Sequence, residues 1–115
     1  MAAALNWDRA LENADGSEEL LVELVDVFLE TYPEMMRQIR AAIDARDAPA
    51  LRRTAHSLKG STRIFAAEPA TEAALQLENM GASGDTTGAE PVWTTLGLEV
   101  ERLKTALAEK RAEAS

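Results

Sequence analysis

Apolar residues recur every three or four positions through most of this chain, and this spacing constrains the fold more than any other feature. The last segment shows it most clearly, with the series Trp93, Leu96, Val100, Leu103 and Leu107. Such steps place side chains on one face of an α-helix, whereas a half-buried strand alternates at every second residue. The pattern therefore predicts helices, and an aromatic content of only 4% also favours helices over strands.

Proline, glycine and capping residues divide this pattern into five expected helices. Ser17 is a good cap for the second helix, which Pro33 is expected to bend or restart. Asp47 is a good cap for the third, with Pro49 in its first turn. The expected helices span about 6–14, 17–43, 48–65, 69–81 and 92–107, and the tail that follows is expected to fray.

Each long helix carries one apolar stripe, and four such stripes bury one another most simply in an antiparallel bundle. We therefore predict an all-α fold, an antiparallel four-helix bundle with a short additional N-terminal helix. The length of 115 residues suits a single domain, residues 1–115 with a core of about 5–110. In the second helix the residues expected to face the core are Leu20, Leu24, Val27, Phe28, Thr31, Met36, Ile39 and Ile43, and in the third helix they are Leu51, Ala55, Leu58, Thr62 and Phe65.

Charge and composition exclude several classes of function. A net charge of -8 opposes binding to nucleic acid or to anionic lipid. No window approaches the roughly 20 apolar residues that span a bilayer, and the N-terminus has no secretory pattern, so we expect a cytoplasmic protein without membrane insertion. The absence of cysteine removes disulfides, thiolate nucleophiles and cysteine-bearing zinc sites.

The single histidine, His56, lies in the one basic stretch of the chain. Carboxylates crowd residues 8–34, whereas residues 48–67 contain none. On a helical wheel His56 falls outside the core stripe, in a band with Arg52, Lys59 and Arg63, and the band is expected to be exposed to solvent. A solvated helix face that happens to contain a histidine is the alternative interpretation.

Two neighbours of His56 point to chemistry at the ring. A cation one turn away, Lys59, opposes protonation of the imidazole and so favours a nucleophilic nitrogen. Gly60 costs about 1 kcal/mol relative to alanine inside a helix, so its presence needs a reason. A bare patch there lets a reacting group of another protein approach the ring, and the ammonium of Lys59 can then neutralise an incoming phosphoryl group.

The motif AHSLKGS, Ala55 to Ser61, resembles the signature of histidine-containing phosphotransfer (HPt) domains, and the surrounding helices are similar to that family over nearly the whole chain. The resemblance implies that His56 accepts a phosphoryl group from a receiver-domain aspartate or a histidine kinase and passes it to another receiver. It assigns phosphoryl stabilisation to Lys59 and steric access to Gly60. The implied partners are response-regulator receiver domains and a hybrid histidine kinase, with this chain a monomer or a part of such a kinase.

The pair Leu77-Glu78 extends the resemblance to the next helix. In the chemotaxis-kinase branch a glutamate at this offset holds the inner nitrogen of the histidine ring, which implies the same for Glu78. Such a contact leaves the outer nitrogen Nε2 free for attack. An ordinary exposed carboxylate is the alternative. The chain departs from the family after KGS, where residues 63–66 read RIFA instead of a short polar residue followed by glycine.

Receiver docking in the family uses an apolar patch with a polar rim. The residues expected to bind the partner are Trp7, Leu11, Arg52, Arg63 and Ile64. Core packing is the alternative for Trp7. The sequence has no ATP-binding loop and no acidic cluster with ligand spacing, so we expect no autonomous kinase activity, no metal and no cofactor, with magnesium supplied by the receiver.

Two other functions stay open at this point. The first is a helical interaction module that binds a receiver or a kinase without accepting phosphate. The second is a dimerisation bundle built on the Trp93 to Leu107 stripe.

Overall fold

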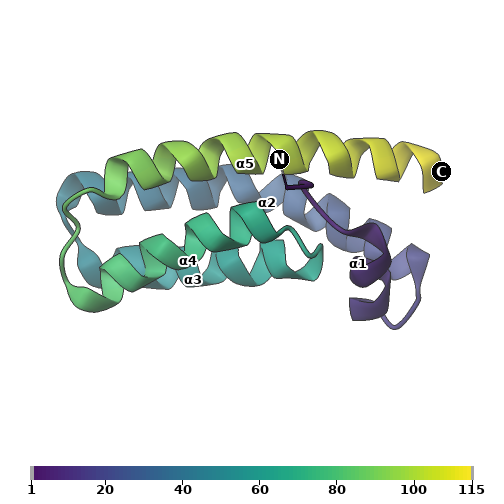
Figure 1. Ribbon diagram of the computed structural model, residues 1–115, viewed down its shortest axis with the longest axis horizontal. Helices are drawn as coiled ribbons and strands as arrows, with labels where there is room; N and C mark the ends of the chain where they lie inside the picture. The colour runs from purple at the N-terminus through teal and green to yellow at the C-terminus, as the bar shows by residue number, and fades with distance from the viewer. Residues whose placement is uncertain (1, 115) are drawn as a thin grey trace.

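The computed structural model describes residues 2–114, and within this range the regular structure is entirely helical. Its helices are α1 (Trp7–Asn13), α2 (Glu18–Ala45), α3 (Ala48–Ile64), α4 (Glu68–Ser83) and α5 (Ala89–Ala114). α2 packs on α3, α3 on α4, α4 on α5 and α5 on α2, which closes a four-helix bundle, and α1 lies at one end of it (Figure 1). The predicted all-α bundle with a short N-terminal helix is confirmed.

The helix starts follow the predicted caps. Ser17 accepts a hydrogen bond from the backbone N–H of Leu20, and Asp47 accepts one from Ala50. α2 runs without interruption across Pro33, so the predicted restart does not occur. α5 continues to Ala114, through the tail that was expected to fray.

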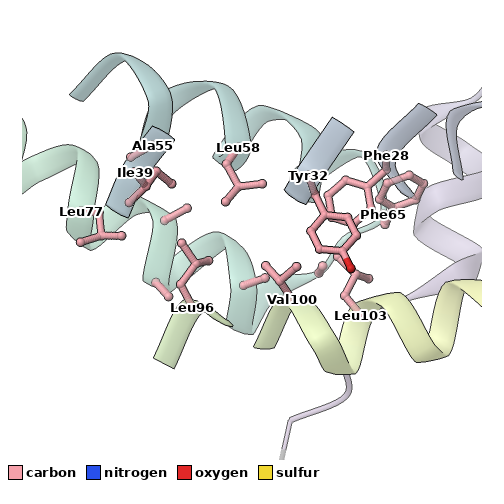
Figure 2. Packing of buried hydrophobic residues seen from close by; sticks show 14 of the residues in the cluster. Phe28, Tyr32, Ile39, Ala55, Leu58, Phe65, Leu77, Leu96, Val100 and Leu103 are labelled. Carbon is pink, nitrogen blue, oxygen red and sulfur yellow. The ribbon is translucent and has the colours of Figure 1, made fainter. Parts of the chain in front are cut away.

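Aromatic rings from α2 and from the C-cap of α3 meet in the core. Phe28 stacks on Tyr32 with ring centroids 5.3 Å apart and meets the edge of Phe65 at 5.6 Å. Figure 2 shows these rings at one end of a line of aliphatic side chains that includes Leu58 and Leu96. All core residues predicted in α3 and its cap are buried, as are four of the five in the last stripe.

The predicted stripe of α2 is wrong by one position before Pro33, whereas after it Ile39 is buried and Met36 and Ile43 pack against the core as predicted. Leu20 is 42% exposed and Val27 is 54% exposed, whereas the buried face carries Leu21, Val25, Phe28, Tyr32 and Ile39. Both sets have helical spacing, and they share Phe28 and Ile39. The large side chain of Tyr32 falls in phase with Leu21 and Val25, and burying it with them removes more apolar surface from water than burying Thr31 would. α2 therefore leaves two large apolar side chains, Leu20 and Val27, exposed on its outer side.

α1 is held in place by the end of α3. The side chain of Asn13 donates hydrogen bonds to the carbonyls of Ile64 at 3.0 Å and Arg63 at 3.4 Å. The backbone N–H of Asn6 donates to the carbonyl of Phe65 at 3.2 Å. The last carbonyls of a helix have no partner inside it, so these bonds satisfy groups that would otherwise need water. They place α1 beside the half of α3 that contains Gly60.

The turn after α3 contains backbone strain at Ala66, which has a φ of 50° in the left-handed region. Glycine adopts this conformation freely, whereas a Cβ is disfavoured there. We expect Ala66→Gly to raise the free energy of unfolding by about 0.5–1 kcal/mol, measured by urea denaturation. The matched control is Ala108→Gly on the exposed side of α5, which should lower it by about 1 kcal/mol. A loss of stability at both positions would contradict the assignment of strain to Ala66.

Candidate functional site

His56 stands on the outer face of α3, and its side chain is 66% exposed. The residues that fix this orientation are Ala55 and Leu58, which are fully buried on the inner face of the same helix. Because three or four residues make one turn, their burial leaves the imidazole on the solvent side. The predicted placement outside the core agrees with the structure.

Glu78 reaches the ring from α4. Its Oε2 lies 2.9 Å from Nδ1 of His56, and its side chain is only 16% exposed. An ionised carboxylate can only accept a hydrogen bond, so Nδ1 is the protonated nitrogen in this contact. The lone pair of the neutral ring is then on Nε2, the outer nitrogen.

Lys59 is expected to be exposed to solvent, but in the structure it is mostly buried. Its Nζ is 2.6 Å from Oε1 of Glu78, and its side chain is only 14% exposed. A helical wheel of α3 places Lys59 in a polar band. A wheel drawn for one helix cannot show that α4 places a carboxylate next to this lysine. Glu78 thus bridges two α3 side chains, His56 through Oε2 and Lys59 through Oε1.

The hydrogen bond from Lys59 is the main cause of a lowered pKa of Glu78, with a smaller contribution from His56, and together they outweigh burial, which raises that pKa. Glu78 is therefore ionised at neutral pH. Its ionisation stabilises the fold above the ordinary pKa of a carboxyl group, and this contribution is lost only as the pH falls through the lowered pKa.

The close approach of α3 and α4 depends on Gly81. A Cβ at this position would lie 2.5 Å from the backbone N of Arg52 and 2.7 Å from the carbonyl O of Ala48. Only a glycine allows the two backbones to come this close, one turn beyond Glu78. The predicted end of this helix is at Gly81, but α4 continues to Ser83. A glycine that interrupts an otherwise regular pattern was the available signal of close packing.

Gly60 differs from Gly81 because no other helix packs closely against it. It is exposed, and apart from its chain neighbours and the adjacent backbone of α3, no atom lies within 4 Å of the position that a Cβ would occupy. Internal packing therefore does not require a glycine here. A groove of about 550 Å³ opens beside it, lined in part by Asn13, Arg63 and Ile64. A second hollow, of about 680 Å³, lies beside His56. The hollow at His56 reaches the ring itself, and the groove at Gly60 lies one turn further along α3.

The residues predicted to bind a partner differ in how far they are exposed to solvent. Arg52 and Arg63 are exposed, and among residues 2–114 neither forms an ion pair. Ile64 is half-buried at the groove beside Gly60. Trp7 and Leu11 are half-buried and pack against the core, which favours the packing alternative stated for Trp7.

The described part of the chain shows neither a cluster of metal ligands nor a membrane-spanning helix. No group of three or more potential metal ligands occurs between residues 2 and 114. Within the same range, none of the helices is both long and apolar enough to cross a membrane.

A helical bundle that presents one exposed histidine, held at its inner nitrogen and flanked by a bare glycine, has the architecture of a histidine phosphotransfer module. The family model named Hpt domain matches residues 23–110, and the chain belongs to this family. The resemblance based on AHSLKGS is thereby confirmed.

Solved structures agree over almost the whole chain. The crystal structure of histidine-containing phosphotransfer protein B (HptB) from Pseudomonas aeruginosa PAO1 is 28% identical, with a TM-score of 0.87 over 98% of both chains. The HPT domain of a sensor hybrid histidine kinase from Shewanella is 22% identical, with a TM-score of 0.81 over 96% of this chain and 95% of that one, and bears on the fold alone. No protein with a curated description gave a significant match.

Proposed function

We propose that this protein is a phosphorelay intermediate. Nε2 of His56 accepts a phosphoryl group from the aspartyl phosphate of a receiver domain, or from a histidine kinase, and passes it to another receiver. The observation that carries the proposal is an imidazole that is 66% exposed while its inner nitrogen is held by Glu78. The family supports phosphotransfer, and the geometry of this chain supports His56 as the acceptor.

The transfer needs little covalent chemistry from this protein. The Nε2 lone pair attacks phosphorus, an N–P bond forms, and the bond from phosphorus to the aspartate oxygen breaks to release the carboxylate. The proton on Nδ1 stays in the hydrogen bond to Glu78. Reversal of the same steps charges the next receiver. We propose that the receiver also holds the magnesium ion, and that this chain has no kinase activity of its own.

The outer side of α2 that carries Leu20 and Val27 is the best candidate for the surface on which a receiver docks. A hollow between α2 and α3 is lined by Thr31 and by Ser57, the neighbour of His56. Val27 lies one turn before Thr31 on the same side of α2, and Leu20 lies two turns further back. Glu30, Glu34 and Arg53 also line this hollow, so we propose that apolar contact at Val27 supplies the main attraction between this surface and a receiver.

We expect Val27→Glu to lower the rate of phosphoryl transfer from a receiver by about tenfold, because a carboxylate would replace apolar contact and repel an acidic partner. Stability should change little, since Val27 is 54% exposed. Leu98→Glu is the matched control, because Leu98 is 64% exposed on α5, a helix that borders α2 and α4. Equal rates for the two variants would remove α2 from the docking surface.

The acceptor is tested by incubation with phosphorylated receivers and magnesium. Wild-type protein should take up phosphate, and His56→Gln should take up none, because an amide nitrogen is not a nucleophile at neutral pH. Equal labelling of the two proteins would contradict the assignment of His56. Receiver binding without labelling of the wild type by any donor in a panel would instead support an interaction module.

A further inference from the structure

Most of the positive charges in this chain are matched by carboxylates. The sequence has 20 acidic residues against 12 lysines and arginines, and most of these cations form an ion pair. Within residues 2–114, the cations that form no ion pair are Arg46, Arg52, Arg53 and Arg63. The last three belong to α3, a helix that contains no carboxylate. Their charge therefore remains available to a partner.

The unpaired arginines of α3 lie on both sides of His56. Arg52 comes one turn before the ring, and Arg63 comes two turns after it on the same face of the helix. Arg52 and Arg53 line the hollow beside His56, and Arg63 lines the groove beside Gly60. Along this face of α3 the unpaired charge is thus positive at both ends, although the chain as a whole carries a net charge of -8.

The groove holds the backbone beneath Arg63 in place. The side chain of Asn13 on α1 donates hydrogen bonds to the carbonyls of Arg63 at 3.4 Å and Ile64 at 3.0 Å. The charged residues that line the groove are two arginines and one glutamate, Glu68, which lies 3.8 Å from Arg9. The groove therefore presents the guanidinium of Arg63 from an anchored position and supplies no second carboxylate to neutralise it.

Charges at the edge of an interface affect the choice of partner more than the total affinity. An exposed ion pair adds little to binding because solvent screens it, whereas two like charges placed opposite each other disfavour a wrong partner. Arg63 is exposed and lies in the segment after KGS, where the chain departs from the family pattern. A residue at such a position can distinguish the partner of this chain from the partners of its relatives.

We propose that Arg63 is a specificity-determining residue for the transfer at His56: its guanidinium pairs with a carboxylate on the docking face of the receiver and disfavours receivers that carry a cation there. This role rests on the proposed function, and it adds the charge that the receiver must present beside the groove. Apolar contact at Val27 supplies the main attraction, and Arg63 decides which receivers can use it.

The affinity of an unphosphorylated receiver, measured by calorimetry at two salt concentrations, tests the charge of Arg63. For the receiver in a panel that binds wild type most tightly, we expect Arg63→Glu to bind about tenfold more weakly at about 50 mM salt and about threefold more weakly at about 500 mM. Lys104→Glu is the matched control, because it changes the net charge equally at a 51% exposed side chain of α5, which borders α2 and α4. Its affinity should stay within about twofold of wild type. Equal losses for the two variants would overturn the proposal.

An exchange of charges between the two proteins tests the partner of Arg63. On the same receiver, each exposed carboxylate around the acceptor aspartate is changed to lysine, one at a time. We expect one of these lysine variants to bind Arg63→Glu about tenfold more tightly than it binds wild type, because the exchange restores an opposite pair. If none of the lysine variants prefers Arg63→Glu to wild type, Arg63 does not select the receiver and the proposal is wrong.

Neither binding measurement involves phosphoryl transfer, so the two proposals fail separately. Failure of His56 to accept phosphate would contradict the proposed function and leave a selective loss of affinity in Arg63→Glu standing. Labelling of His56 together with equal receiver affinities for wild type and Arg63→Glu would overturn this inference alone. A wild type that binds no receiver in the panel would overturn this inference as well.

Discussion

Gly81→Ala is expected to lower the free energy of unfolding by about 2–3 kcal/mol, because its Cβ would collide with backbone that cannot rotate away. The nearest atoms are the backbone N of Arg52 at 2.5 Å and the carbonyl O of Ala48 at 2.7 Å. α3 and α4 must separate to accept the methyl group, and the pair of His56 and Glu78 spans these same helices. Urea denaturation measures the loss.

The matched control is Gly97→Ala in α5. A Cβ there would meet only Cε of Met36, at 3.8 Å, which is an ordinary contact with a flexible side chain. This variant should be as stable as wild type or more stable by up to about 1 kcal/mol, since alanine is the better helix former. If Gly81→Ala matched Gly97→Ala in stability, the close approach of α3 and α4 would not depend on glycine.

Gly60→Leu is expected to slow phosphoryl transfer from a receiver by about 100-fold while leaving the fold at least as stable as wild type. Apart from its chain neighbours and the adjacent backbone of α3, no atom lies within 4 Å of a Cβ at Gly60, so the leucine side chain projects into solvent and improves helix propensity. The same side chain would occupy the space through which the receiver approaches His56, and small displacements of reacting groups cost large factors in rate. Stopped-flow or quenched transfer assays give the rate.

A small phosphodonor such as phosphoramidate provides the control for the chemistry itself. It needs no protein docking, so Gly60→Leu and wild type should be labelled by it at similar rates. A variant that loses both reactions would have a damaged imidazole site, and a variant that keeps both would show that Gly60 is not a steric opening.

The helices and two of the core stripes could be predicted because helical spacing and caps are local properties of the sequence. α3 was predicted well, since Leu51 and Leu58 lie on one apolar face beside a plainly polar band. The part of α2 before Pro33 was not, because apolar residues occupy two adjacent faces there and only the neighbouring helices decide which face is buried. Val27 and Leu20 became exposed for this reason.

The site shows the same division between local and tertiary information. His56 and Gly60 were found from their spacing and their chemistry on one helix. The contact of Glu78 with the ring was expected from family resemblance alone. The burial of Lys59 and the close packing at Gly81 depend on the distance between α3 and α4, which no periodicity within one helix contains.

The position of phosphate after incubation with a phosphorylated receiver and magnesium tests the central claim most directly. Acid-labile, base-stable phosphate is expected on His56 alone, bonded to Nε2, as located by tandem mass spectrometry and by nitrogen–phosphorus coupling in NMR. Acid-stable phosphate on Ser57 or Ser61, or a phosphoryl group on Nδ1 of the ring, would contradict it.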